Sequence, residues 1–236
     1  MIFSRPLARI LARLRGHPDE ANSPTRELIE PHVPNPVPAD FMVVLRESIG
    51  LNISALSLEP VDQELQTALS LAADSASEDL AWYHFLADMH IRFVSYVDGV
   101  AHPISRDKFL AYELSVEDAI DVALHNIRRT FGEPTFRQWS QGVQIVQGES
   151  PDIDSSYLLD DEFWEDLDSQ HPEGLVVAVP KRGGLLFATA NDSQAVDLLT
   201  QNVTYLHSTS AEMRVSGALL NRKAGRWSLR QEAVDD

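Results

Sequence analysis

Apolar residues recur at helical spacing in several stretches of the chain. The clearest stripe predicts a helix over 116–130, because Ser115 can cap its start and Gly132 can end it. The residues of this stripe are Ala119, Val122, Ala123 and Ile127. The same spacing predicts helices over 2–15, near 60–74, and after Asn191 or Asp192.

Aromatic and β-branched runs between turn residues predict strands, most of them paired as hairpins. Hairpins are predicted for 80–87 with 91–97, for 135–140 with 143–147, and within 218–229. Further strands are predicted at 175–180, at 185–190, and at the start of 156–170, where a short strand leads into an acid-rich helix. Together these elements predict an α+β fold, with a mostly antiparallel or mixed sheet and packed helices.

Prolines concentrate near the N-terminus and divide the chain into three parts. They interrupt 16–39, which we expect to be an extended linker. Residues 1–15 are predicted to form a basic amphipathic helix, and 40–236 a single α+β domain. The helix over 2–15 offers a basic face to an anionic membrane surface, but one short face anchors weakly, so packing on the acidic domain is favoured.

The chain is strongly acidic, with 36 Asp and Glu against 19 Lys and Arg and a formal charge of −17. This excess opposes binding to phosphate backbones, so no nucleic acid is expected as a partner. No apolar run reaches the roughly 20 residues of a membrane-spanning helix. The absence of cysteine excludes disulfides, thiolate metal sites and a cysteine nucleophile. Without a secretory-signal pattern, a cytoplasmic protein is expected.

Several blocks stand in a compatible order and spacing over roughly 80–230. They are 114–129, 155–167 with 173–188, and 219–227. Together they resemble the bacterial YtpQ-like family, a group of uncharacterised proteins. The resemblance implies a fold type and a bacterial cytosolic setting, and it implies no reaction and no catalytic residue.

The densest charge lies around 160–168, where acids stand among aromatic residues. The residues that make up this candidate partner-binding site are Asp160, Asp161, Glu162, Trp164, Glu165, Asp166 and Asp168. Such a surface would attract a basic protein, and a buried tryptophan would add affinity. Clustered carboxylates also suit Mg²⁺ binding or acid–base chemistry. The simpler interpretation is an amphipathic helix that packs its aromatics and exposes its acids.

The turn formed by Lys181, Arg182, Gly183 and Gly184 has the composition of an anion-binding loop, with two cations and flexible backbone N–H groups. A tight connection between two strands explains the same residues more simply.

The eight histidines show no pair at a metal-binding spacing such as HExxH. His84 and His90 are expected to face one another across the first hairpin, near Asp88, but the spacing supplies no third ligand. No glycine loop for a nucleotide and no GxSxG motif occurs. We therefore predict neither a metal site nor a cofactor.

Two functions from different classes stay open at this point. The favoured one is non-catalytic binding of a basic protein, for example neutralisation of a toxin, as an immunity protein does. The alternative is a metal-assisted hydrolase that uses carboxylates of 152–168 with His84 or His90. Whether the chain is an enzyme is left open.

Overall fold

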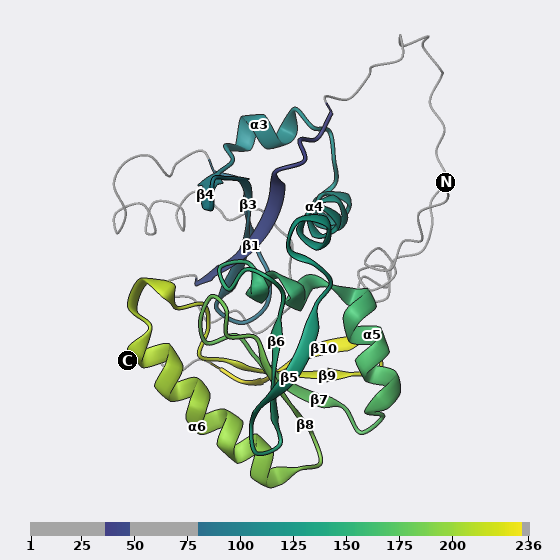
Figure 1. The fold of residues 1–236 in the computed structure, drawn as a ribbon, viewed down its shortest axis with the longest axis vertical. Coiled ribbons are helices and arrows are strands. Elements are labelled where there is room, and N and C mark those ends of the chain that lie inside the picture. The colour runs from purple at the N-terminus through teal and green to yellow at the C-terminus, as the bar shows by residue number, and fades with distance from the viewer. Residues whose placement is uncertain (1–35, 48–79, 233–236) are drawn as a thin grey trace, which may run out of the picture.

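The computed structural model describes residues 36–47 and 80–232. Two antiparallel sheets and the helices packed on them form this part of the chain, which confirms the predicted α+β class (Figure 1). The helices predicted over 2–15 and near 60–74 lie outside the described residues, as does most of the predicted 16–39 linker. No helix in the described ranges is long and apolar enough to cross a membrane.

The smaller sheet has β3 at its centre, with β1 along one side and β2 and β4 along the other. Its strands are β1 (Phe41–Glu47), β2 (Trp82–His84), β3 (Met89–Val97) and β4 (Val100–Pro103). The first predicted hairpin is confirmed as β2 and β3, with His84 directly opposite His90. Neither β1 nor β4 was predicted from the sequence.

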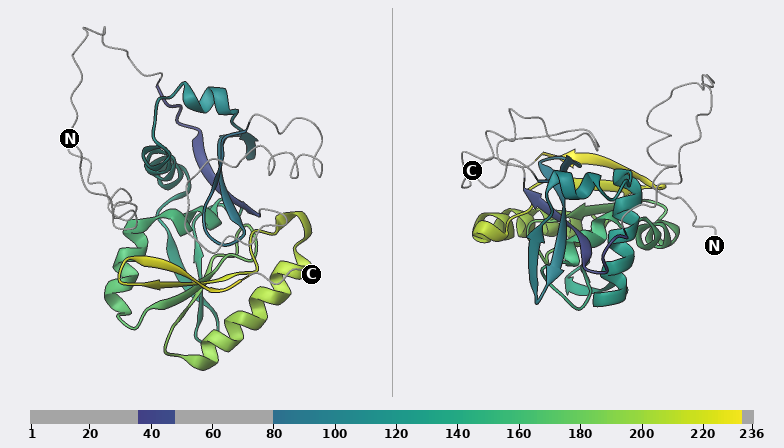
Figure 2. Two further views of the ribbon diagram at one scale, coloured as in Figure 1. Left: turned by 180° about the vertical axis from the view of Figure 1, so that it is seen from behind. Right: turned by 90° about the horizontal axis from the view of Figure 1, so that it is seen from above.

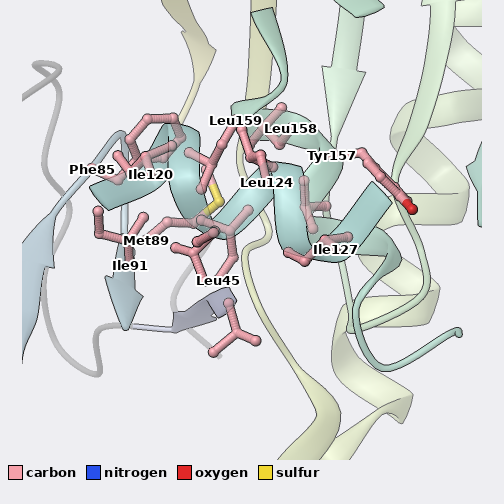
Figure 3. Packing of buried hydrophobic residues seen from close by; sticks show 14 of the residues in the cluster. Leu45, Phe85, Met89, Ile91, Ile120, Leu124, Ile127, Tyr157, Leu158 and Leu159 are labelled. Atoms are coloured by element: carbon pink, nitrogen blue, oxygen red, sulfur yellow. The ribbon is translucent and has the colours of Figure 1, made fainter. Parts of the chain in front are cut away.

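One face of the smaller sheet is apolar and packs against α4 (Val116–Phe131) (Figure 3). Leu45 of β1 and Ile91 of β3 stand directly opposite one another and meet Ile120 and Leu124 of the helix in this cluster. Toward the other end of the same face, aromatic rings stack between β3 and the short helix α3 (Arg106–Leu110). This apolar face fixes the position of the sheet, so its opposite face is free to carry polar residues.

Helix α4 begins and ends close to where the sequence predicts. The Ser115 hydroxyl accepts a hydrogen bond from the backbone N–H of Asp118 at 3.0 Å, and Gly132 ends the helix with φ of 80°. The helix also holds the start of β1, since the Asn126 side-chain amide donates to the Phe41 carbonyl at 2.9 Å. Val37, near the end of the predicted linker, packs against the same core.

The larger sheet has six antiparallel strands in the order β10-β9-β7-β8-β6-β5. They are β5 (Thr135–Ser140), β6 (Val143–Gln147), β7 (Leu175–Ala178), β8 (Leu186–Thr189), β9 (Leu219–Lys223) and β10 (Arg226–Gln231). All six correspond to strands predicted from the sequence. Both hairpins, β5 with β6 and β9 with β10, form as predicted.

Helices cover both faces of the larger sheet, as the views in Figure 2 show. Val176 and Ala178 pack on α6 (Ser193–Thr209), whereas Leu175 and Val177 face the main core, where α5 (Asp161–Gln170) contributes its apolar side. Alternate side chains of β7 therefore pack into two different hydrophobic layers, one on each face of the sheet. Asp192 caps α6, as predicted, by accepting the Ala195 N–H at 3.0 Å. The short 3₁₀ turn η2 (Ala211–Met213) follows α6.

The strand predicted at the start of 156–170 is wrong: this segment belongs to a 3₁₀ helix, η1 (Asp154–Leu159). Every residue of η1 is buried. The Ser156 hydroxyl donates to the Val43 carbonyl of β1 at 2.7 Å, which anchors the turn between the two sheets. The apolar run in this segment therefore reflects burial on all sides and not pairing in a sheet.

Candidate functional site

The predicted acidic segment lies on α5, and its first acid starts the helix. Asp160 is the N-cap, and its Oδ1 accepts the Phe163 N–H at 3.2 Å. Trp164 is fully buried, and its indole N–H donates to the Tyr157 carbonyl at 2.8 Å. Its ring also meets Trp227 edge to face, with centroids 5.2 Å apart. Trp164 is thus a core residue.

Four of the six acids are turned toward arginines of the same molecule. Arg128 of α4 binds Asp160, with Nε to Oδ2 at 2.9 Å, and reaches Glu162 at 2.7 Å. Arg222 of β9 binds Asp161 at 3.2 Å and Asp168 at 2.9 Å. These contacts fasten α5 to its neighbours on two sides.

The Arg222 pairs are deeply buried. The arginine side chain is 0% exposed, against 5% for Asp161 and 11% for Asp168, and its guanidinium lies 5.0 Å from the centre of the Trp227 ring. Burial raises the pKa of Asp161 to about 6, although Arg222 acts in the opposite direction. Asp168 also accepts the backbone N–H of Gly225 at 2.8 Å, which fixes the β9–β10 turn.

The exposed part of the acidic segment is therefore small. Glu165 and Asp166 are exposed, and Glu162 is 77% exposed while it contacts Arg128. The prediction of a surface for a basic partner applies to these three side chains.

The predicted anion-binding turn, Lys181 to Gly184, connects β7 to β8. Two of its backbone N–H groups donate hydrogen bonds to carbonyls of the same molecule. The Gly184 N–H donates to the Lys181 carbonyl at 3.0 Å, and the Arg182 N–H donates to the Met213 carbonyl at 2.9 Å. Gly183 has φ of 77°, and a side chain there would lie 2.6 Å from the Pro151 carbonyl oxygen. These are features of a tight strand connection.

The charge of Arg182, however, acts on two arginines of the smaller sheet, Arg46 and Arg92. Arg46 of β1, His90 of β3 and His84 of β2 stand directly opposite one another in one row. Val44, Arg92 and Trp82 form the next row, two residues along each strand. Directly paired residues share a face, so both rows lie on the face opposite the apolar one. We call Arg46, Arg92, Arg182 and His90 the cationic cluster.

The Trp82 ring packs against two members of the cationic cluster, His90 and Arg92. Its ring stacks on the His90 ring with centroids 4.4 Å apart, and the Arg92 guanidinium carbon lies 3.9 Å from its centre. His90 is 1% exposed. The Trp82 ring and the strand pairing hold Arg92 and His90 in place.

Burial and mutual repulsion disfavour the charged forms of the arginines in the cationic cluster. Burial, together with the charge of Arg182, lowers the pKa of Arg46 to about 9 and that of Arg92 to about 10. Burial and the neighbouring arginines hold the pKa of His90 well below its usual value, so this ring is neutral at pH 7. Among the described residues, the carboxylate of Asp152 opposes these effects and raises the pKa of Arg46.

Several donors of the cationic cluster are buried without an acceptor in the part of the chain that the structure describes. They are Nε of Arg92, Nε of Arg182 and the adjacent indole N–H of Trp82. Buried donors and charges normally have partners, because desolvation without compensation costs several kcal/mol. The arrangement is suited to an acceptor that carries negative charge.

A second group of polar residues has the composition of a metal site. Among the described residues, Glu47, Asp88 and His207 are the one set of three His or acidic side chains whose ligand atoms all lie within 4.8 Å of one another. The carboxylates of 152–168 form no such set with His84 or His90 in these ranges. The hydrolase interpretation stays a prediction.

The sequence contained a weak sign of the cationic cluster. Arg92 interrupts an apolar β-branched run, which is unusual for a central strand unless the residue has a specific role. Its neighbour Arg46 could not be placed, because β1 was not predicted. Glu47 and His207 are 160 residues apart, and only tertiary structure brings them together.

Comparisons with known proteins add no relative. No protein-family model matches the chain, and no curated protein or solved structure is significantly similar to it. The resemblance to the YtpQ-like family stays a prediction.

Proposed function

We propose that this protein binds a small doubly charged oxyanion, of the phosphate type, at the cationic cluster. The observation that carries the proposal is a set of partly buried arginines, two of them with a buried Nε that has no acceptor, for which the described residues supply too few negative partners. Arg46, Arg92 and Arg182 contribute three positive charges, and Asp152 offers one negative charge. A dianion would balance the remainder.

The choice of a phosphate-type ligand follows from the donors. Guanidinium groups present N–H pairs in a planar fork that matches the oxygens of phosphate and carboxylate. A carboxylate would leave one positive charge uncompensated, whereas a phosphate monoester or phosphate ion would not. The proposal concerns binding and does not include a reaction.

The binding can be tested on the full chain by thermal and urea unfolding with sodium phosphate, against sodium chloride at equal ionic strength. A ligand that binds only the folded protein stabilises it by about 2.7 kcal/mol at a hundredfold excess over its Kd. We expect saturable stabilisation by phosphate and none by chloride.

Arg92→Met distinguishes a ligand site from an internal ion pair. Without phosphate, the variant should be as stable as the wild type or more stable, because a desolvated and repelled cation is removed. With phosphate, it should lose most of the stabilisation, since a hydrogen bond to a charged group contributes about 1.5–3 kcal/mol. Arg137→Met is the matched control, because this arginine lies exposed on edge strand β5 and contacts Gln147.

The proposal fails if phosphate has no effect on the wild type and Arg92→Met lowers stability in every buffer. That result would mean that a carboxylate of the chain itself neutralises the cationic cluster.

A second proposal retains the acidic surface that the sequence predicts. The exposed side chains of Glu162, Glu165 and Asp166, together with the formal charge of −17, favour encounters with a basic protein in a cytoplasmic setting. Neutralising these three acids should slow association with such a partner at low salt and change little at high salt. If the wild type and the neutralised variant associate at equal rates at low salt, these three acids are not part of the binding surface.

A further inference from the structure

Three segments that are distant in sequence converge at one end of the smaller sheet. Glu47 is the last residue of β1, Asp88 lies in the turn between β2 and β3, and His207 lies in the last turn of α6. Ala87, with φ of 56°, shapes this turn, and Asp88 is only 6% exposed. The acids and the imidazole are therefore placed by the fold and not by local sequence.

The distances between the three side chains are close to those of a metal site. The His207 Nε2 atom lies 3.1 Å from Glu47 Oε1, and one ligand atom from each residue lies within 4.8 Å of the other two. Ligands about 2.0–2.2 Å from a tetrahedral ion are separated by roughly 3.3–3.6 Å. The three side chains need only a small closing movement to reach this arrangement.

Neighbouring groups orient two of these side chains from outside. The Ser216 hydroxyl donates to Asp88 Oδ1, and Nε of Arg214 lies 3.6 Å from Glu47 Oε2. The first contact is a hydrogen bond and the second an ion pair, and contacts of this kind from residues behind the ligands hold metal-binding carboxylates in position. The ligand atoms used by the ion would be Glu47 Oε1, Asp88 Oδ2 and His207 Nε2.

The charges within the group also favour a cation. Two carboxylates, those of Glu47 and Asp88, lie close together beside one imidazole. The arginine beside them, Arg214, is 37% exposed and lies at the edge of the group. A divalent ion between the three ligands would neutralise both acids directly.

We propose that Glu47, Asp88 and His207 bind a divalent transition-metal ion, with Zn²⁺ as the best fit. Imidazole favours Zn²⁺ over Mg²⁺ and Ca²⁺, which prefer oxygen ligands throughout. Three protein ligands leave a fourth position of the tetrahedron open to water. The inference does not depend on the cationic cluster, which shares no residue with this site.

The test is isothermal titration calorimetry of the full chain with Zn²⁺, Mn²⁺ and Mg²⁺ after removal of bound metal by a chelator. We expect one Zn²⁺ per chain, bound at least a hundredfold more tightly than Mg²⁺. Co²⁺ in place of Zn²⁺ should give visible absorption typical of a four-coordinate ion.

Two variants and one control decide whether these residues are the ligands. His207→Ala and Glu47→Gln should each weaken Zn²⁺ binding by at least a hundredfold and remove the Co²⁺ absorption. Circular dichroism and thermal unfolding will show that each variant is folded. His171→Ala is the control, because His171 also lies beside an acid, 3.5 Å from Glu173, without a third ligand in the described ranges.

The proposal is overturned if both folded variants bind Zn²⁺ as tightly as the wild type, because the ion would then be held by other histidines. It is also overturned if Zn²⁺ binds no more tightly than Mg²⁺. The three residues would then form only an internal hydrogen-bonded group.

Discussion

Replacing Arg222 with methionine should strongly destabilise the protein. Methionine keeps much of the length and apolar surface of the side chain but removes the charge that faces Asp161 and Asp168. Both acids are nearly inaccessible to water, at 5% and 11% exposure. Breaking a buried ion pair by removing one partner typically costs about 3–5 kcal/mol, because the other charge is left without compensation.

The pKa of Asp161 supports a loss of this size. Even with Arg222 present, burial raises this pKa from 3.8 to about 6. A rise of two units corresponds to about 3 kcal/mol between the protonated and the ionised carboxyl. Removal of the arginine raises the folded-state pKa further. The folded variant then binds protons that the unfolded chain does not, so its stability falls as pH rises above about 4.

Urea unfolding followed by tryptophan fluorescence would measure the effect at pH 5 and pH 8. We expect Arg222→Met to lose about 3–5 kcal/mol at pH 8 and clearly less at pH 5. Adding Asp161→Asn and Asp168→Asn to this variant should restore much of the loss. Arg226→Met, at an exposed position of the same hairpin, should change stability by no more than about 0.5 kcal/mol. A loss below about 1 kcal/mol, or a triple variant no better than Arg222→Met alone, would refute the reasoning.

Three shorter predictions concern other parts of the core. Trp164→Ala should cost about 3–5 kcal/mol in urea unfolding, since the ring is fully buried; a loss near zero would contradict its place in the core. Gly142→Ala should lower the melting temperature, because φ is 70° and the new Cβ would lie 2.5 Å from the Cβ of Ala195. An unchanged melting temperature would contradict this conformation of the β5–β6 turn. Burial raises the pKa of Asp154 to about 6, so wild-type stability should fall between pH 4 and pH 7, and Asp154→Asn should flatten that dependence.

The elements that the sequence predicted well are those with both a repeating pattern and a marked end. Helix α4 has an apolar stripe, Ser115 before it and Gly132 after it, so its bounds could be placed within a residue or so. The hairpin of β5 and β6 was placed by the Gln141–Gly142 turn between two alternating runs. Local chemistry decides such elements, and tertiary contacts only add to it.

The sequence-based predictions fail where residues are buried on all sides, because the apolar residues then show no repeating spacing. Every residue of η1 is buried, so its apolar run resembles a strand although the backbone is a 3₁₀ helix. β1 has buried residues on both faces and therefore shows no alternation. The candidate sites were missed for a further reason. The cationic cluster depends on the register that places Arg46 opposite His90, and this register is not encoded in either strand alone.

The sequence also did not show which residues contact the acids of α5. Their number and spacing were visible in the sequence, but their partners were not. Arg128 and Arg222 lie in separate elements, one upstream and one downstream, and each is brought to the helix by the fold. A charged segment that looks exposed in sequence can therefore be largely occupied by internal contacts.

The position of β1 has a consequence for fragments of this chain. Five consecutive side chains of β1, from Phe41 to Leu45, are at most 1% exposed, yet the strand lies upstream of the 80–230 region that resembles a family. A polypeptide that starts at residue 80 would leave one edge of β3 unpaired and its apolar face partly bare. Such an edge can accept a strand from outside. A peptide spanning 36–47, or the same strand of a second molecule, would complete the sheet, as in donor-strand complementation.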